Sequence, residues 1–202
     1  MQRTQQLMFT IALLGFLTFA GHAKAQNSNL LADTDFAKAA SLVANPPADA
    51  DPIKLLHLSP WKFFEIELPA SVSYESGKAV LAGKRVFLHS MAFDVEAGKD
   101  YTVQVKGEGT GNISVGLLWW SSYDENTIRA AEPHWSKMSE PETLAGETIN
   151  LKQTFTAPKD ATRAYLRIEV AEVPKREGEE ADNIIEPEPT KVTVSNPSVT
   201  AK

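Results

Sequence analysis

A period of two in the apolar residues constrains this chain more than any other feature, and it runs through almost the whole sequence after residue 60. In Tyr101–Lys106 and Tyr165–Val170, apolar side chains alternate strictly with polar ones. Because successive side chains of a strand point to opposite faces, this pattern predicts strands with one buried face and one polar face. Only Phe36–Ala44 offers a pattern suited to a short helix.

The alternation predicts about ten short strands, separated by glycine, proline and aspartate turn signals. The expected strands are Asn29–Phe36, Trp61–Leu68, Ser71–Glu75, Lys78–Ala82, Arg85–Val95, Lys99–Glu108, Asn112–Ser121, Ile149–Thr156, Ala164–Ala171 and Lys191–Thr200. Many short strands without a repeated helical pattern favour an all-β fold, either an antiparallel β-sandwich or a jelly roll.

The first 25 residues are typical of a signal peptide. Arg3 precedes an apolar run from Leu7 to Ala20, and Ala23-Lys24-Ala25 resembles an A-x-A cleavage site. That run is shorter than the roughly 20 residues that a spanning helix needs, although an uncleaved anchor is the alternative. We expect cleavage after Ala25, which leaves 26–202 as a single secreted or periplasmic domain.

The composition limits the partners of the secreted chain. Removing Arg3 and Lys24 with the leader leaves 18 basic against 26 acidic residues, a net charge of −8. An acidic chain without a basic cluster is unsuited to nucleic acid or to an anionic membrane surface. The chain has no cysteine, so its stability must come from a hydrophobic core rather than from disulfides.

Residue patterns typical of catalysis are missing, which predicts a protein that is not an enzyme. His57, His89 and His134 lack the spacing of metal ligands, and the chain contains no G-x-S-x-G sequence. His89 lies in an alternating segment, as expected of a half-buried histidine with a hydrogen-bond partner. Glu65 and Glu67 share the spacing of a glycosidase pair, but a solvated strand face is the more ordinary interpretation.

Two adjacent tryptophans distinguish the segment 112–121. Ile113, Val115, Leu117 and Trp119 form one apolar row, so Trp119 is assigned to the core. Trp120 falls on the other, mixed face, the kind of face that carries Gln104 and Arg167 elsewhere. A flat ring beside amide and guanidinium donors suits sugar recognition, because the ring covers C–H groups while the donors bind hydroxyls.

Tyr123 and Trp135 follow in the long connection after Trp120 and are predicted to add further aromatic surfaces for a ligand. The alternative is that segment 121–147 folds over Trp120 and makes its ring part of a satellite core. Alternation along the sequence does not separate these two outcomes.

Several segments resemble carbohydrate-binding modules of the CenC-like type, which have a galactose-binding-domain-like jelly roll. The resemblance rests on Asn29–Phe36 (NLLADTDF), Val95–Gly107 (VEAGKDYTVQVKG), Thr154–Pro158 (TFTAP), Ala164–Ile168 (AYLRI) and Val192–Val199 (VTVSNPSV). It implies a jelly roll and, as partner, a polysaccharide or other glycan. These sequences specify the fold more than the ligand.

Modules of this type often hold a structural calcium between their first and last strands. Ala37 and Ser195 stand where the family has acids, while Asp33, Asp35 and Asn196 remain as oxygen ligands. We therefore expect no cofactor, and a calcium ion, if bound, would use these three residues.

Three functions are compatible with these features. The first is a secreted, non-catalytic carbohydrate-binding protein that uses Trp120, Gln104 and Arg167, with Tyr123 and Trp135 beside them. The second is a structural or protein-interaction β-sandwich of a secreted or cell-surface assembly, without a sugar site. A jelly-roll lyase or hydrolase is third, because no acid–base pair stands out.

Overall fold

The computed structural model describes residues 28–49, 58–75, 77–121, 135–173 and 190–202. One short helix, α1 (Ala37–Ala44), precedes the strands. The strands are β1 (Trp61–Glu75), β2 (Lys78–Ser90), β3 (Phe93–Asp94), β4 (Asp100–Trp120), β5 (Trp135–Met138), β6 (Glu142–Thr156), β7 (Arg163–Ala171) and β8 (Lys191–Ala201). The all-β prediction is confirmed, and the strand pairs within the described residues are antiparallel.

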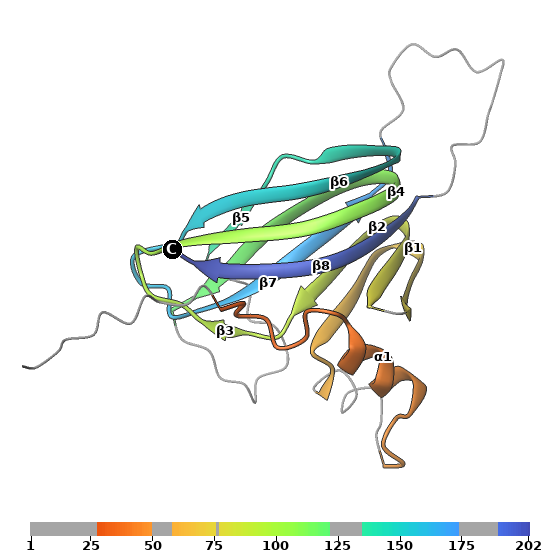
Figure 1. The fold of residues 1–202 in the computed structure, drawn as a ribbon, viewed down its shortest axis with the longest axis horizontal. Helices are drawn as coiled ribbons and strands as arrows, with labels where there is room; N and C mark the ends of the chain where they lie inside the picture. Colours follow the sequence, from red (N-terminus) through yellow and green to blue (C-terminus); the bar gives the residue numbers. More distant parts are fainter. Residues whose placement is uncertain (1–27, 50–57, 76, 122–134, 174–189) are drawn as a thin grey trace, which may run out of the picture.

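Hydrogen bonds join the strands into one network, which bends into the two layers of a sandwich (Figure 1). In the first layer, which we call the β8 layer, β8 lies between β2 and residues 100–110 of β4, and β6 lies beyond β4. In the second, the β7 layer, β7 lies between residues 85–89 of β2 and residues 112–120 of β4. The long strands β2 and β4 therefore each contribute one part of their length to the β8 layer and the other part to the β7 layer.

Glycines mark the points at which these strands pass between layers. The strand bounds expected from the sequence place a break at Gly83 and another between Gly109 and Gly111, and both breaks are wrong, since β2 and β4 continue through these points. Gly83, Gly109 and Gly111 have φ values of 139°, 130° and 135°, in a region of backbone conformation that residues with a Cβ rarely adopt. The chain bends sharply there without leaving the strand ladder.

The N-terminal segment differs from the expected strand Asn29–Phe36, because it is irregular and leads into α1. It is attached to β8 by the Leu30 amide, which donates to the Val199 carbonyl at 2.8 Å. The expected helix is confirmed as Ala37–Ala44. Asp33 accepts hydrogen bonds from the backbone N–H groups of Lys38 and Ala39, which satisfies donors that the first helical turn leaves open.

The main hydrophobic core lies between the two layers and contains the apolar rows of the alternating strands. Trp119 is 1% exposed in this core, as predicted, and its ring meets Phe155 edge-on. Other details differ from the expected strands: β5 pairs with the end of β4, β6 begins seven residues before the expected Ile149, and β1 joins the two expected strands Trp61–Leu68 and Ser71–Glu75. No described helix is long and apolar enough to cross a bilayer.

Candidate functional site

The three residues expected to form one ligand surface lie on opposite sides of the sandwich. Gln104 projects from the outer face of the β8 layer, since its neighbours Val103 and Val105 are buried in the core. Arg167 projects from the outer face of the β7 layer, between the buried Leu166 and Ile168. The prediction that Gln104 joins Arg167 and Trp120 is therefore wrong, because β4 changes layer between residues 104 and 120.

Trp120 lies on the predicted face but is buried, with 2% of its surface exposed. It belongs to a second cluster with Leu118 and Tyr165, and its ring meets that of Tyr165 edge-on at a centroid distance of 4.5 Å. Of the two outcomes that the sequence left open for Trp120, satellite packing describes the residue and an exposed ring does not. Alternation assigned the face correctly, but exposure depends on what covers that face.

The other predicted aromatic residues are not brought into a described surface. Tyr123 lies outside the described residues. Trp135 begins β5, where its backbone pairs with Trp119, and its side chain lies outside the described part of the chain. The register between β1 and β2 shifts between Glu65 and Glu67, which removes the regular spacing on which their pairing was argued.

The residues of the expected calcium set have other roles in the described structure. Asp33 caps α1, and one carboxylate oxygen of Asp35 accepts the Ala37 N–H at 3.1 Å. Asn196 lines a cavity on the outer face of the β8 layer. Among the described residues, no three histidine, aspartate or glutamate side chains gather as a metal site.

The outer face of the β7 layer carries a cluster of rings around Arg167, which we call the Arg167 cluster (Phe64, Phe87, His89 and Arg167). Arg167 and His89 are directly opposite on β7 and β2, and the Arg167 Nε donates to the His89 Nε2 at 2.8 Å. The guanidinium carbon lies 4.3 Å from the centre of the Phe87 ring. His89 is therefore half-buried with a partner, as the sequence predicted.

Phe64 completes the cluster from β1, with its half-buried ring centred 4.7 Å from that of His89. Cation–π contact and a hydrogen bond together hold the Arg167 guanidinium in a fixed plane. Within the described residues, its two terminal nitrogens donate no hydrogen bond to protein. Four N–H donors are thus held ready for a ligand beside an aromatic surface.

Two positively charged side chains, Arg167 and Lys62, lie close enough to His89 to affect its pKa. Burial, followed by the charges of Arg167 and Lys62, lowers the pKa of His89 to about 3. The imidazole is neutral at physiological pH, and since Nε2 accepts from Arg167, the proton resides on Nδ1. Burial also lowers the pKa of Lys62 and of Arg167. Glu169, an acid on this face, is paired with Arg85 at 2.8 Å.

The low pKa of His89 predicts acid sensitivity. Unfolded chains protonate this histidine below pH 6.5, whereas the folded protein resists protonation until about pH 3. The free energy of unfolding should therefore fall as the pH falls through this window, by up to about 1.4 kcal/mol per pH unit from this residue. Urea unfolding at pH 7, 5 and 4 should show a shallower decline for His89→Gln than for the unchanged protein. Equal declines would contradict the assigned pKa.

A hollow of about 310 Å³ adjoins the Arg167 cluster on the same face. Glu169 lies between Phe87 and Ser114 in the cross-strand register, so the ring and the hollow are continuous. The hollow is lined by Arg85, Asn112, Ser114, Pro141, Glu169, Ala171 and Glu172. Hydroxyl, amide and charged groups thus lie next to the Phe87 ring, which is 9% exposed and lies under the guanidinium groups of Arg85 and Arg167.

Sequence reasoning identified Arg167 but missed the residues around it. Lys62 and Phe64 alternate in Trp61–Leu68, and Phe87 and His89 alternate in Arg85–Val95, which places each pair on one strand face. That signal was available from the sequence. The register of β1, β2 and β7 was not, and it alone brings these pairs beside Arg167.

No family model and no curated protein matches the sequence. Among solved structures, the enzymatically active domain of tailspike protein 4 of bacteriophage CBA120 aligns with a TM-score of 0.53 and 11% identity. The alignment covers 86% of this chain and 21% of that one, so this chain spans about a fifth of the tailspike chain. At this identity the likeness concerns the fold alone.

Several other similar structures are carbohydrate-binding modules. The N-terminal cellulose-binding domain of Cellulomonas fimi β-1,4-glucanase C aligns with a TM-score of 0.45 and 13% identity, over 71% of this chain and 90% of that one. A Clostridium thermocellum xylanase 10B structure with CBM22-1 and GH10 modules, complexed with xylohexaose, aligns with a TM-score of 0.48 and 13% identity, over 71% and 26%.

Proposed function

We propose that this chain is a non-catalytic carbohydrate-binding protein that holds a glycan on the outer face of its β7 layer. The observation that carries the proposal is the Arg167 guanidinium, fixed by His89 and Phe87 with its terminal donors open. A rigid planar donor suits neighbouring sugar hydroxyls, and the half-buried Phe64 ring, which packs against His89, suits the C–H face of a sugar. The adjoining hollow provides room for a further sugar unit.

The chemistry of the same face supports binding rather than catalysis. His89 has a pKa of about 3 and accepts from Arg167 through Nε2, so it is poorly suited to transfer protons near neutral pH. Glu169 is engaged by Arg85. A general acid and a general base facing one substrate are therefore not assembled from these described residues.

Removal of the Arg167 side chain tests the proposal. A broad glycan panel identifies a ligand for the unchanged protein, and its dissociation constant is then measured for Arg167→Ala and Arg167→Lys. We expect both changes to weaken binding about tenfold or more, since lysine keeps the charge but loses the planar donors. Lys159→Ala, at an exposed turn, is the control and should bind normally.

Two results would overturn the proposal. Full affinity in Arg167→Ala would move the binding site elsewhere. Absence of binding to every glycan would favour a structural or protein-interaction role instead. Phe64→Ala serves as an independent variant, because a half-buried ring at β1 can be removed without emptying the main core.

We also propose that the protein is exported from the cytoplasm. This part of the proposal rests on the leader Met1–Ala25, which lies outside the described residues. A polymeric glycan is accessible outside the cytoplasm, which agrees with a secreted or periplasmic location. N-terminal sequencing of the protein from its host should begin at Gln26, and a sequence that begins at Met1 would contradict cleavage.

A further inference from the structure

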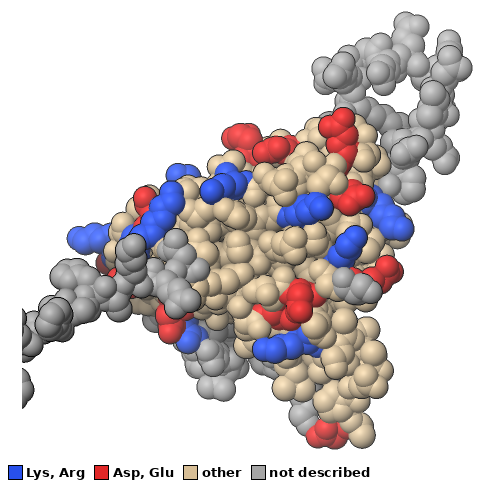
Figure 2. All heavy atoms as spheres, in the orientation of Figure 1, with Lys and Arg blue, Asp and Glu red and all other residues tan. Residues whose placement is uncertain are grey.

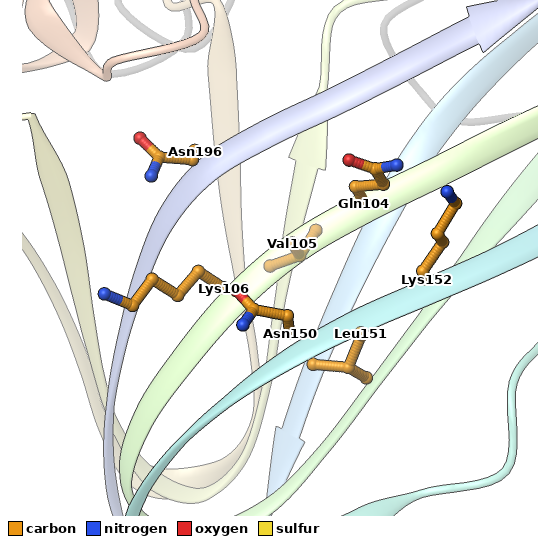
Figure 3. Close-up of a pocket in the computed structure, with 7 residues that line it drawn as sticks. All are labelled: Gln104, Val105, Lys106, Asn150, Leu151, Lys152 and Asn196. Atoms are coloured by element: carbon orange, nitrogen blue, oxygen red, sulfur yellow. The ribbon is translucent and has the colours of Figure 1, made fainter.

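A second cavity opens on the opposite side of the sandwich, on the outer face of the β8 layer (Figure 3). Its volume is about 380 Å³. It is lined by Gln104, Val105, Lys106, Asn150, Leu151, Lys152 and Asn196, which come from β4, β6 and β8. The functional groups are three amides and two ammonium groups, and we call this set the lysine cavity.

The register arranges these groups in an alternating pattern. Gln104 is directly opposite Lys152, and Lys106 is directly opposite Asn150. Each cross-strand pair therefore combines one amide with one lysine, and the two lysines are diagonal neighbours. Figure 3 shows the two lysine side chains at opposite ends of the cavity, with their ammonium groups pointing away from each other, so each is placed to meet a separate anionic group. Direct opposition of the two charges, which would be destabilising, is avoided.

Asn196 adds the third amide through an irregularity in β8. The register of β8 against β4 shifts between Gln104 and Lys106, which inserts an extra residue at this point. Asn196 has a φ of 50°, in the left-handed region that few residues other than glycine and asparagine adopt readily. Bulges of this kind redirect side chains, and here the bulge brings an amide to the cavity.

No carboxylate lines the lysine cavity. Glu108 lies further along the same face of β4, opposite Thr148, and outside the cavity lining. Among the described residues, Lys106 and Lys152 form no ion pair. Figure 2 shows blue side chains over the strands of this face, with red ones mainly towards its margins. A cationic hollow is thus present on a protein whose overall charge is negative.

We propose that the lysine cavity is a second binding site, selective for an acidic glycan whose successive sugar units carry carboxylates or sulfate esters. Lys106 and Lys152 each neutralise one anionic group, at either end of the cavity, and the three amides donate to and accept from the sugar hydroxyls between them. Because this site and the Arg167 cluster lie on opposite layers, it does not depend on the function proposed for Arg167. One molecule is then able to contact two polymer chains at once.

The test compares polymers that differ in charge. Dissociation constants are measured for polygalacturonate and its methyl ester, and for dextran sulfate and dextran. We expect tighter binding of at least one acidic polymer than of its neutral counterpart, weakening as salt is added. Lys106→Gln combined with Lys152→Gln should weaken acidic binding about tenfold or more and leave neutral binding unchanged. Lys84→Gln combined with Lys159→Gln removes the same charge elsewhere and should have little effect.

The polymer that binds identifies the anionic group, polygalacturonate for a carboxylate and dextran sulfate for a sulfate ester. Equal losses in both double variants would indicate a net-charge effect and overturn the site, as would unchanged acidic affinity in the Lys106 and Lys152 variant. Failure to prefer either acidic polymer would also overturn it. Arg167→Ala separates the two proposals, because it should leave the Lys106- and Lys152-dependent part of acidic binding intact. An unchanged melting temperature confirms folding of the variants.

Discussion

Trp120→Ala should lower the free energy of unfolding by about 3–5 kcal/mol, the range measured for removal of large aromatic side chains from protein cores. The side chain is 2% exposed and packs with Leu118 and Tyr165, so the substitution leaves a cavity beneath the outer face of the β7 layer. Glycan affinity of the folded protein should change much less, because the Trp120 ring is not accessible to a ligand.

Urea unfolding measures the first quantity, and binding below the unfolding transition measures the second. Trp120→Phe is the matched control, since it keeps an aromatic ring against Tyr165 and should lose less stability than Trp120→Ala. The opposite pattern, in which Trp120→Ala unfolds normally but loses the ligand, would show that the ring is an exposed sugar-binding surface. That pattern would contradict the burial described above.

Gly109→Ala should destabilise the protein by roughly 2–4 kcal/mol, because the substitution adds a steric clash to an unfavourable backbone conformation. Gly109 has a φ of 130°, and a Cβ at this position would lie 2.1 Å from the backbone oxygen of Lys191. Neither atom can move without disturbing the pairing of β4 with β8, which continues on both sides of this point.

Gly98→Ala separates the two contributions. Gly98 also has a positive φ, of 74°, but no atom lies within 4 Å of its added Cβ. The loss of stability in Gly98→Ala should therefore come from the backbone conformation alone and stay near 1 kcal/mol. Thermal or urea unfolding of both variants gives the comparison, and similar losses would show that the close approach of β4 to β8 contributes little.

Both proposed binding surfaces depend on the same corner at Gly109. Residues of β4 before it contribute Gln104 and Lys106 to the lysine cavity, and residues after it pair with β7 beside Arg167. A correctly folded corner is thus required for both surfaces, although the surfaces themselves are chemically independent. Loss of both activities in Gly109→Ala would reflect folding, so the side-chain variants above are the ones that test binding.

The sequence by itself determined most of the strand segments, which face of each is apolar, and that a short helix forms within Phe36–Ala44. Trp119 was correctly assigned to the core, and His89 to a half-buried position with a partner. These predictions succeeded because alternation is a local property, which the direction of successive side chains imposes within a single strand.

Only the tertiary structure decided which layer each strand half joins, and therefore which polar residues share a surface. Gln104 and Arg167 have equivalent local patterns but lie on opposite outer faces, because β4 crosses between layers at glycines that locally resemble a turn. Trp120 is buried because its face is covered at that end, which a pattern within one strand cannot report. Which strands pair, and which segment covers a given strand face, depend on residues far apart in the sequence. A periodicity of two therefore assigns each residue to a face of its strand, but it does not identify the residues beside it on that face.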